Sequence, residues 1–71
     1  MIINFDKQFY KLPAIKEAIK AYENLAMFKQ KELKDKIEVK IDNIDPKFKD
    51  VLKDEFCNYV LAKSKHGDKS D

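Results

Sequence analysis

Apolar residues recur along the chain with two different periods, and each period predicts one kind of element. In residues 13–26 the apolar positions are Ile15, Ala18, Ile19, Tyr22 and either Leu25 or Ala26. Steps of three and four residues place these side chains on one face of an amphipathic helix. Pro13 suits the first position of that helix, because the amide hydrogen that proline lacks has no partner there.

A second stripe with the helical period occupies residues 46–63. It consists of Phe48, Val51, Leu52, Phe56, Tyr59, Val60 and Lys63. Asp45 has the carboxylate that an N-cap needs, and Pro46 suits the first helical position. We therefore expect the second helix to begin at Pro46.

Three further segments favour strands. Residues 36–41 alternate strictly between charged residues and isoleucine or valine, which predicts a strand with one buried and one solvated face. This strand needs a partner, so residues 27–33, which could also continue the first helix, are assigned to a strand. The turn at Lys34-Asp35 lacks the glycine that a tight hairpin prefers, which leaves the register open. Residues 2–5 predict a third, short strand.

The resulting order of strand, helix, strand, strand, helix predicts an α+β fold. One face of a single sheet can bury both helical stripes, and the most economical sheet order is 1-3-2, with residues 36–41 in the middle. This is a two-layer β-α-β-β-α sandwich with both helices on one face, similar to a ferredoxin-like fold without its last strand. Residues 1–63 are expected to form this one domain. Residues 64–71, which offer nothing to bury, are expected to be a disordered C-terminal tail.

Charge limits the partners that this domain would bind. All 15 basic residues are lysines, 13 residues are acidic, and the net charge is +2. Arginine supplies the fork that reads base edges and grips phosphate, so specific nucleic-acid recognition is disfavoured. The alternative is a weak nucleic-acid-binding module that uses the open sheet face, through Lys29, Lys31, Lys36 and Lys40. Glu32 and Glu38, on or near that face, argue against it.

The residues that catalysis or metal binding would require are scarce. His66, Ser64 and Ser70 all lie in the expected tail, which cannot hold an active site to the required tolerance. Cys57 has no further cysteine or histidine nearby to share a metal, and it is expected at the edge of the core. Gly67 is the single glycine, so no glycine-rich phosphate loop exists. We therefore expect a protein without enzymatic activity, cofactor or metal.

Cysteine usage and hydropathy indicate a location. One cysteine allows no intramolecular disulfide, whereas small secreted domains usually have several. The N-terminal segment lacks the pattern of a signal peptide, and no apolar run approaches the roughly 18 residues that span a membrane. A cytoplasmic protein that does not bind membranes is the expectation.

One combination of segments resembles a known family. It consists of Phe5-Asp6, Tyr10, Ala14-Ile15, Ala18, Tyr22, Ile37-Glu38-Val39 and Glu55-Phe56-Cys57-Asn58-Tyr59-Val60-Leu61. These residues are similar to those of the His-Xaa-Ser system protein HxsD and its shorter relatives, over most of the chain up to about Leu61. The resemblance implies an accessory role beside radical enzymes that modify a peptide carrying His-Xaa-Ser repeats. It assigns no catalytic residue.

The expected function is recognition of a peptide or protein partner. In a sheet of order 1-3-2 the strand at residues 2–5 has an unpaired edge, which a guest strand could extend. Pairing of this edge with itself in a homodimer is the open alternative. Phe9 and Tyr10 fall between elements and are either a lid on the core or an exposed contact patch. The candidate partner-binding residues are Ile2, Asn4, Phe9, Tyr10 and Asn58.

Overall fold

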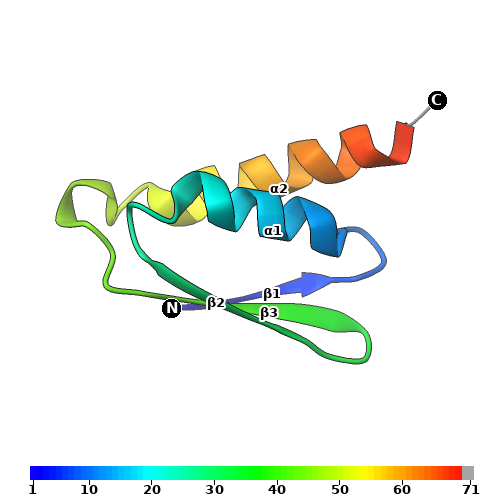
Figure 1. The fold of residues 1–71 in the computed structure, drawn as a ribbon, viewed down its shortest axis with the longest axis horizontal. Helices are drawn as coiled ribbons and strands as arrows, with labels where there is room; N and C mark the ends of the chain where they lie inside the picture. The colour runs from blue at the N-terminus through cyan, green and yellow to red at the C-terminus, as the bar shows by residue number, and fades with distance from the viewer. Residues whose placement is uncertain (70–71) are drawn as a thin grey trace.

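A three-stranded sheet forms one layer of the molecule and two helices form the other (Figure 1). The computed structural model describes residues 1–69, and the side chains of residues 1–65. The elements are β1 (Ile2–Asp6), α1 (Leu12–Tyr22), β2 (Met27–Glu32), β3 (Lys36–Asp42), the 3-10 turn η1 (Pro46–Phe48) and α2 (Leu52–Lys69). The predicted α+β class and the helical and strand identity of all five main elements are confirmed.

β3 lies between β1 and β2 and is antiparallel to both. This confirms the predicted order 1-3-2. Residues directly opposite each other in such pairs point to the same face of the sheet. Ile3 lies opposite Val39 and Phe5 opposite Ile37, so β1 and β3 direct these four residues toward the helices. All four of these side chains are buried.

The ring of Phe56 on α2 occupies the centre of the core and is fully buried. It stacks on Phe28 of β2 with the ring centroids 5.1 Å apart. It also contacts Phe5 of β1 at 6.1 Å and Tyr22 of α1 at 6.2 Å. One side chain of α2 therefore joins both outer strands and the other helix.

The hairpin between β2 and β3 closes through the two residues Lys34 and Asp35. The amide of Leu33 donates to the carbonyl of Lys36 at 2.8 Å, which fixes the register that the sequence left open. Among the residues with described backbone, Asn43 alone has a positive φ, of 52°, so this loop is not one of the primed turns that glycine allows.

The second helix begins later than expected. Asp45 does act as a cap, since its carboxylate accepts a hydrogen bond from the Lys47 amide at 3.0 Å, but the turn that it caps is η1. The amides of Phe48, Lys49 and Val51 each donate to the carbonyl three residues back, and a bond of α-helical span then joins the Glu55 amide to the Val51 carbonyl. The prediction that α2 starts at Pro46 is wrong for this reason. Val51, expected in the buried stripe, is 47% exposed.

The boundary of the domain also lies further along the chain than residue 63. Ser64 is buried, and its hydroxyl accepts a hydrogen bond from the amide of Lys11 at 3.2 Å. It therefore belongs to the domain, not to a tail. The side chains of residues 66–71, which include His66, Gly67 and Ser70, lie outside the described residues.

Replacing Ser64 with alanine tests this contact. The partly buried Lys11 amide would lose its acceptor, which should lower the free energy of unfolding by about 1–3 kcal/mol. Urea denaturation followed by circular dichroism measures the change. Lys65→Ala, on the next and exposed position, should stay within about 0.5 kcal/mol of the parent. Equal stability of the two variants would mean that the buried hydroxyl contributes nothing.

Candidate functional site

One side of the β1 backbone carries no strand within the described part of the chain. Met1 and Ile41 exchange two hydrogen bonds, Met1 N to Ile41 O at 3.1 Å and Ile41 N to Met1 O at 2.8 Å. Bonded and non-bonded positions alternate in an antiparallel pair, so Ile3 and Phe5 also pair with β3. The backbone groups of Ile2 and Asn4 and the amide of Asp6 consequently point outward, whereas the carbonyl of Asp6 is occupied by hydrogen bonds from the amides of Phe9 and Tyr10.

Ile2 and Asn4 present their side chains on the sheet face that the helices leave uncovered. Both are exposed, and Ile2 is 55% accessible. Across the sheet they lie opposite Lys40 and Glu38 of β3. The structure therefore brings these two candidate residues together on one edge strand.

Phe9 and Tyr10 separate into the two roles that the sequence could not distinguish. The carbonyl of Asp6 accepts hydrogen bonds from the amides of both residues, each at 3.0 Å, which makes a tight turn after β1. Tyr10 folds inward and meets Phe5 edge to face with centroids 5.0 Å apart. Phe9 is 66% exposed. Tyr10 is thus part of the lid on the core, while Phe9 is a surface residue beyond the end of β1.

Asn58 does not join the other four candidates. It lies on α2 two residues after the buried Phe56, which is about 200° of helix rotation. Its side chain is exposed on the side of the helix layer that faces away from the sheet. Ile2 and Asn4 lie on the opposite surface of the sandwich.

Sequence reasoning missed that β2 also offers a free edge. Leu33 and Lys36 form a hydrogen-bonded pair at the hairpin, so by alternation the backbone groups of Phe28, Gln30 and Glu32 point away from β3. The order 1-3-2 contains this signal, because the end strands of any open three-stranded sheet both have an unpaired side.

The four lysines proposed for nucleic-acid contact do share the uncovered sheet face. Lys29 lies directly opposite Lys40, an arrangement of like charges that disfavours folding. Acids are interspersed: Lys31 lies opposite Glu38, Lys36 lies opposite Asp6, and the Lys40 ammonium is 3.9 Å from the Asp42 carboxylate.

Glu32, expected on or near this face, instead lies on the helix side, because its partner across the sheet is Ile37. Its carboxylate is 2.7 Å from the ammonium of Lys7. This hydrogen bond and the charge of Lys7 lower the pKa of Glu32. The Lys7 amide also donates to the carbonyl of Asp35 at 3.1 Å. Lys7 therefore links the tip of the β2–β3 hairpin to the segment that follows β1.

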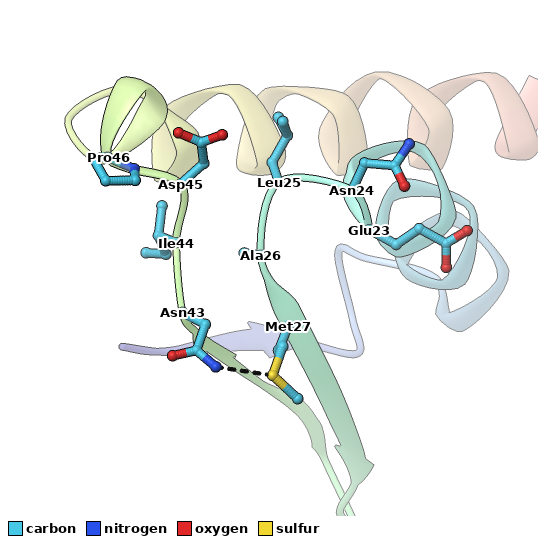
Figure 2. A pocket seen from close by; sticks show the side chains of 9 residues that line it. All are labelled: Glu23, Asn24, Leu25, Ala26, Met27, Asn43, Ile44, Asp45 and Pro46. Carbon is cyan, nitrogen blue, oxygen red and sulfur yellow. Dashed lines mark hydrogen bonds between the residues drawn. The ribbon is translucent and has the colours of Figure 1, made fainter.

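The loop after α1 and the loop after β3 line a shallow depression of about 600 Å³. Both loops lie at the opposite end of the sheet from the hairpin (Figure 1). The loop after α1 and the loop after β3 run side by side there, joined by a hydrogen bond of 2.8 Å from the Asp45 amide to the Leu25 carbonyl. The Asn43 side-chain amide lies 3.1 Å from the sulfur of Met27 (Figure 2). The two acids at its rim, Glu23 and Asp45, lie on opposite sides of the depression, so they do not form a carboxylate pair.

Cys57 lies at the core edge as expected and is partly buried. Burial raises the pKa of its thiol, which keeps the sulfur protonated at neutral pH and weakens it as a nucleophile. Within the described residues, no three His, Cys, Asp or Glu side chains gather closely enough to hold a metal ion. None of the helices in that part of the chain has the length and apolar character needed to cross a bilayer.

Comparison of the chain with family models, with curated proteins and with solved structures finds no match. The geometry of the β1 edge is therefore the basis for its proposed role.

The contact between Lys7 and Glu32 predicts a pH dependence of stability. Because folding lowers the pKa of Glu32 from its ordinary value of 4.5, the stabilisation is complete above that value and is lost as the pH falls through the folded pKa. Glu32→Gln should therefore be less stable than the parent at pH 7 but equal to it in strong acid. Urea titrations at both pH values measure this.

Lys7→Met provides the matched background for this experiment. In a chain without the ammonium, Glu32→Gln should change stability equally at both pH values, as a double-mutant cycle would report. A pH-dependent difference that persists in the Lys7→Met background would assign the effect to another group.

Proposed function

We propose that this protein is a non-enzymatic binding module that takes up an extended segment of a peptide or partner protein along β1. The observation that carries the proposal is the unpaired edge, where Ile2 and Asn4 turn their amides and carbonyls outward. A guest strand gains main-chain hydrogen bonds at such an edge and specificity from alternate side chains. In a complete ferredoxin-like sheet a fourth strand would occupy this position.

The composition of β1 supports this edge over that of β2. Lysine on an edge strand is a common protection against unwanted pairing, and β2 has Lys29 and Lys31 together with Glu32. β1 has the sequence Ile-Ile-Asn-Phe-Asp, without lysine and with one charge at its end. The side chains of Ile2 and Asn4 themselves carry no charge.

The geometry of β1 also defines what the guest should look like. Guest side chains on the helix side would lie beside Ile3 and Phe5, which belong to the core, so apolar residues fit there. Those on the other side would lie beside Ile2 and Asn4 in solvent. Phe9, exposed just past the end of β1, offers an apolar contact to a residue beyond the paired segment.

The resemblance to HxsD suggests which peptides to examine first. The context of that family is a peptide that carries His-Xaa-Ser repeats. We propose an accessory role in the maturation of such a peptide as the biological context.

Two proline variants test the function. A synthetic His-Xaa-Ser repeat peptide should shift the amide resonances of Ile2, Asn4 and Asp6 in the parent. Asn4→Pro removes an outward N–H without breaking a bond to β3, and it should abolish these shifts. Gln30→Pro makes the same change on the edge of β2 and should leave them unchanged. Shifts that survive Asn4→Pro, or that occur mainly on β2, would place binding elsewhere.

A second candidate, weak binding of nucleic acid, rests on the placement of Lys29, Lys31, Lys36 and Lys40 on one face. Four lysine–phosphate contacts with single-stranded RNA predict a salt slope of about −3 in log K against log salt. Lys40→Gln should reduce the slope by about 0.7, whereas Lys47→Gln on η1 should not change it. RNA affinity that does not respond to salt would remove this candidate.

A further inference from the structure

We propose that the guest strand of β1 runs antiparallel to it and begins with a proline opposite Asp6. The inference rests on the proposed function, because it concerns the same edge, and it names the class of sequence that the edge takes up. It follows from the hydrogen-bond donors and acceptors that the edge leaves open, whose numbers are unequal. The antiparallel direction is preferred because such pairing is slightly more stable per residue than parallel pairing.

The outer side of β1 offers more donors than acceptors. The amides of Ile2, Asn4 and Asp6 point outward, and among the described residues only Ile2 and Asn4 also present an open carbonyl there. The Asp6 carbonyl accepts hydrogen bonds from the amides of Phe9 and Tyr10, each at 3.0 Å. A carbonyl oxygen has two lone pairs, so both acceptor positions of this oxygen are taken. A guest strand therefore meets three amides but two carbonyls.

The turn after β1 keeps the Asp6 carbonyl occupied. The Asp6 carboxylate accepts a further hydrogen bond from the Gln8 amide at 2.8 Å. The Tyr10 ring contacts the buried ring of Phe5, with the centroids 5.0 Å apart. To free the carbonyl, the chain would have to open this turn and move Tyr10 away from Phe5. The unequal number of donors and acceptors is therefore a fixed property of the folded edge.

The occupied carbonyl defines the first residue of an antiparallel guest. At hydrogen-bonded positions of such a pair, opposite residues exchange two bonds, which the guest can do opposite Asn4 and opposite Ile2. Opposite Asp6 the guest carbonyl accepts from the Asp6 amide, but a guest amide would face an oxygen with no free lone pair. An amide left without a partner costs free energy. Proline has no amide hydrogen and is tolerated on edge strands, so it fits this position.

Phe9 provides a second reason at the same end of the edge. Its amide donates to the outward carbonyl of Asp6, which places its backbone on the outer side of β1. Its side chain is 66% exposed. Exposed aromatic rings bind proline in the grooves that recognise proline-rich segments. The missing acceptor and the exposed ring therefore favour the same residue at this end of the guest.

Three blocked pentapeptides test the inference. Acetyl-Pro-Val-Thr-Val-Thr-amide places proline opposite Asp6, valines opposite Phe5 and Ile3, and threonines opposite Asn4 and Ile2. It should bind the parent chain about fivefold more tightly than the same peptide with alanine in the first position. A peptide with proline in the third position should not bind, because the Asn4 carbonyl then loses its donor. Titration followed by the amide resonances of Ile2 and Asn4 measures the three affinities.

A variant of Phe9 separates the contribution of the ring from that of the carbonyl. Phe9→Ser should weaken binding of the proline peptide about threefold. It should leave part of the preference for proline over alanine, because the Asp6 carbonyl stays occupied. Val51→Ser, at a 47% exposed apolar position before α2, should change neither affinity. Circular dichroism checks that both variants are folded.

The outcomes separate this inference from the proposed function. Equal affinity for the proline and alanine peptides, with shifts along β1, overturns the inference and leaves the proposed function intact. Tighter binding of the reversed sequence, with proline last, would indicate a parallel guest and also overturns the inference. If the His-Xaa-Ser peptide shifts β1 and none of the pentapeptides does, the inference alone fails. Absence of shifts on β1 with every peptide contradicts both.

Discussion

The packing of Phe56 between the sheet and the first helix is the contact on which the rest of this fold depends. A chain of 71 residues buries only about 60% of the surface that it exposes when unfolded, so few side chains can hold the layers together. Phe56 stacks on Phe28 and also meets Phe5 and Tyr22. Its one ring therefore fixes the position of β2, β1 and α1 relative to α2. Because Phe28 and Phe5 lie on the two outer strands, the same ring also holds the edges of the sheet in place beneath the helices. The packing of Phe56 therefore also positions the backbone of the β1 edge.

The alternation and helical stripes that build this core are local patterns, and the sequence predicts them well. Ile37, Val39 and Ile41 alternate with charged residues and form the buried face of β3, and Leu52, Phe56 and Val60 recur at helical spacing on α2. Two of the features that sequence reasoning missed depend on tertiary contacts. The hydroxyl of Ser64 is buried because it meets the amide of Lys11, 53 residues away. Tyr10 faces inward and Phe9 outward because the turn after Asp6 rotates only one of two adjacent rings toward Phe5. Neither contact leaves a periodic trace in the sequence.

The candidate site likewise combines one feature that the sequence predicts with others that depend on tertiary contacts. The sheet order, which the element order predicts, is sufficient to identify β1 as an edge. Which of its residues face outward depends on register, and the register is set by the bonds of Met1 to Ile41 at one end and of Lys7 to Asp35 at the other. A shift by one residue would turn Ile3 and Phe5 to solvent, so the buried core enforces the register that exposes the backbone of Ile2 and Asn4. Asn58 is a candidate through the resemblance to HxsD, which does not indicate the side of the sandwich on which it lies, and the structure separates it from the other candidates.

A thin stability margin and an open edge are related properties of this molecule. Within the described residues, three strands covered by helices on one face bury the core, and the outer side of β1 leaves backbone groups of Ile2 and Asn4 that a further strand could pair with. Any occupant that binds the folded chain and not the unfolded one adds its binding free energy to the stability of the fold. A guest strand along β1 would lengthen the sheet and extend the layer of apolar residues that begins with Ile3 and Phe5. The proposed uptake of a strand rests on this geometry: within the described residues β1 has a neighbour on one side only, and the backbone groups of Ile2 and Asn4 point to the other.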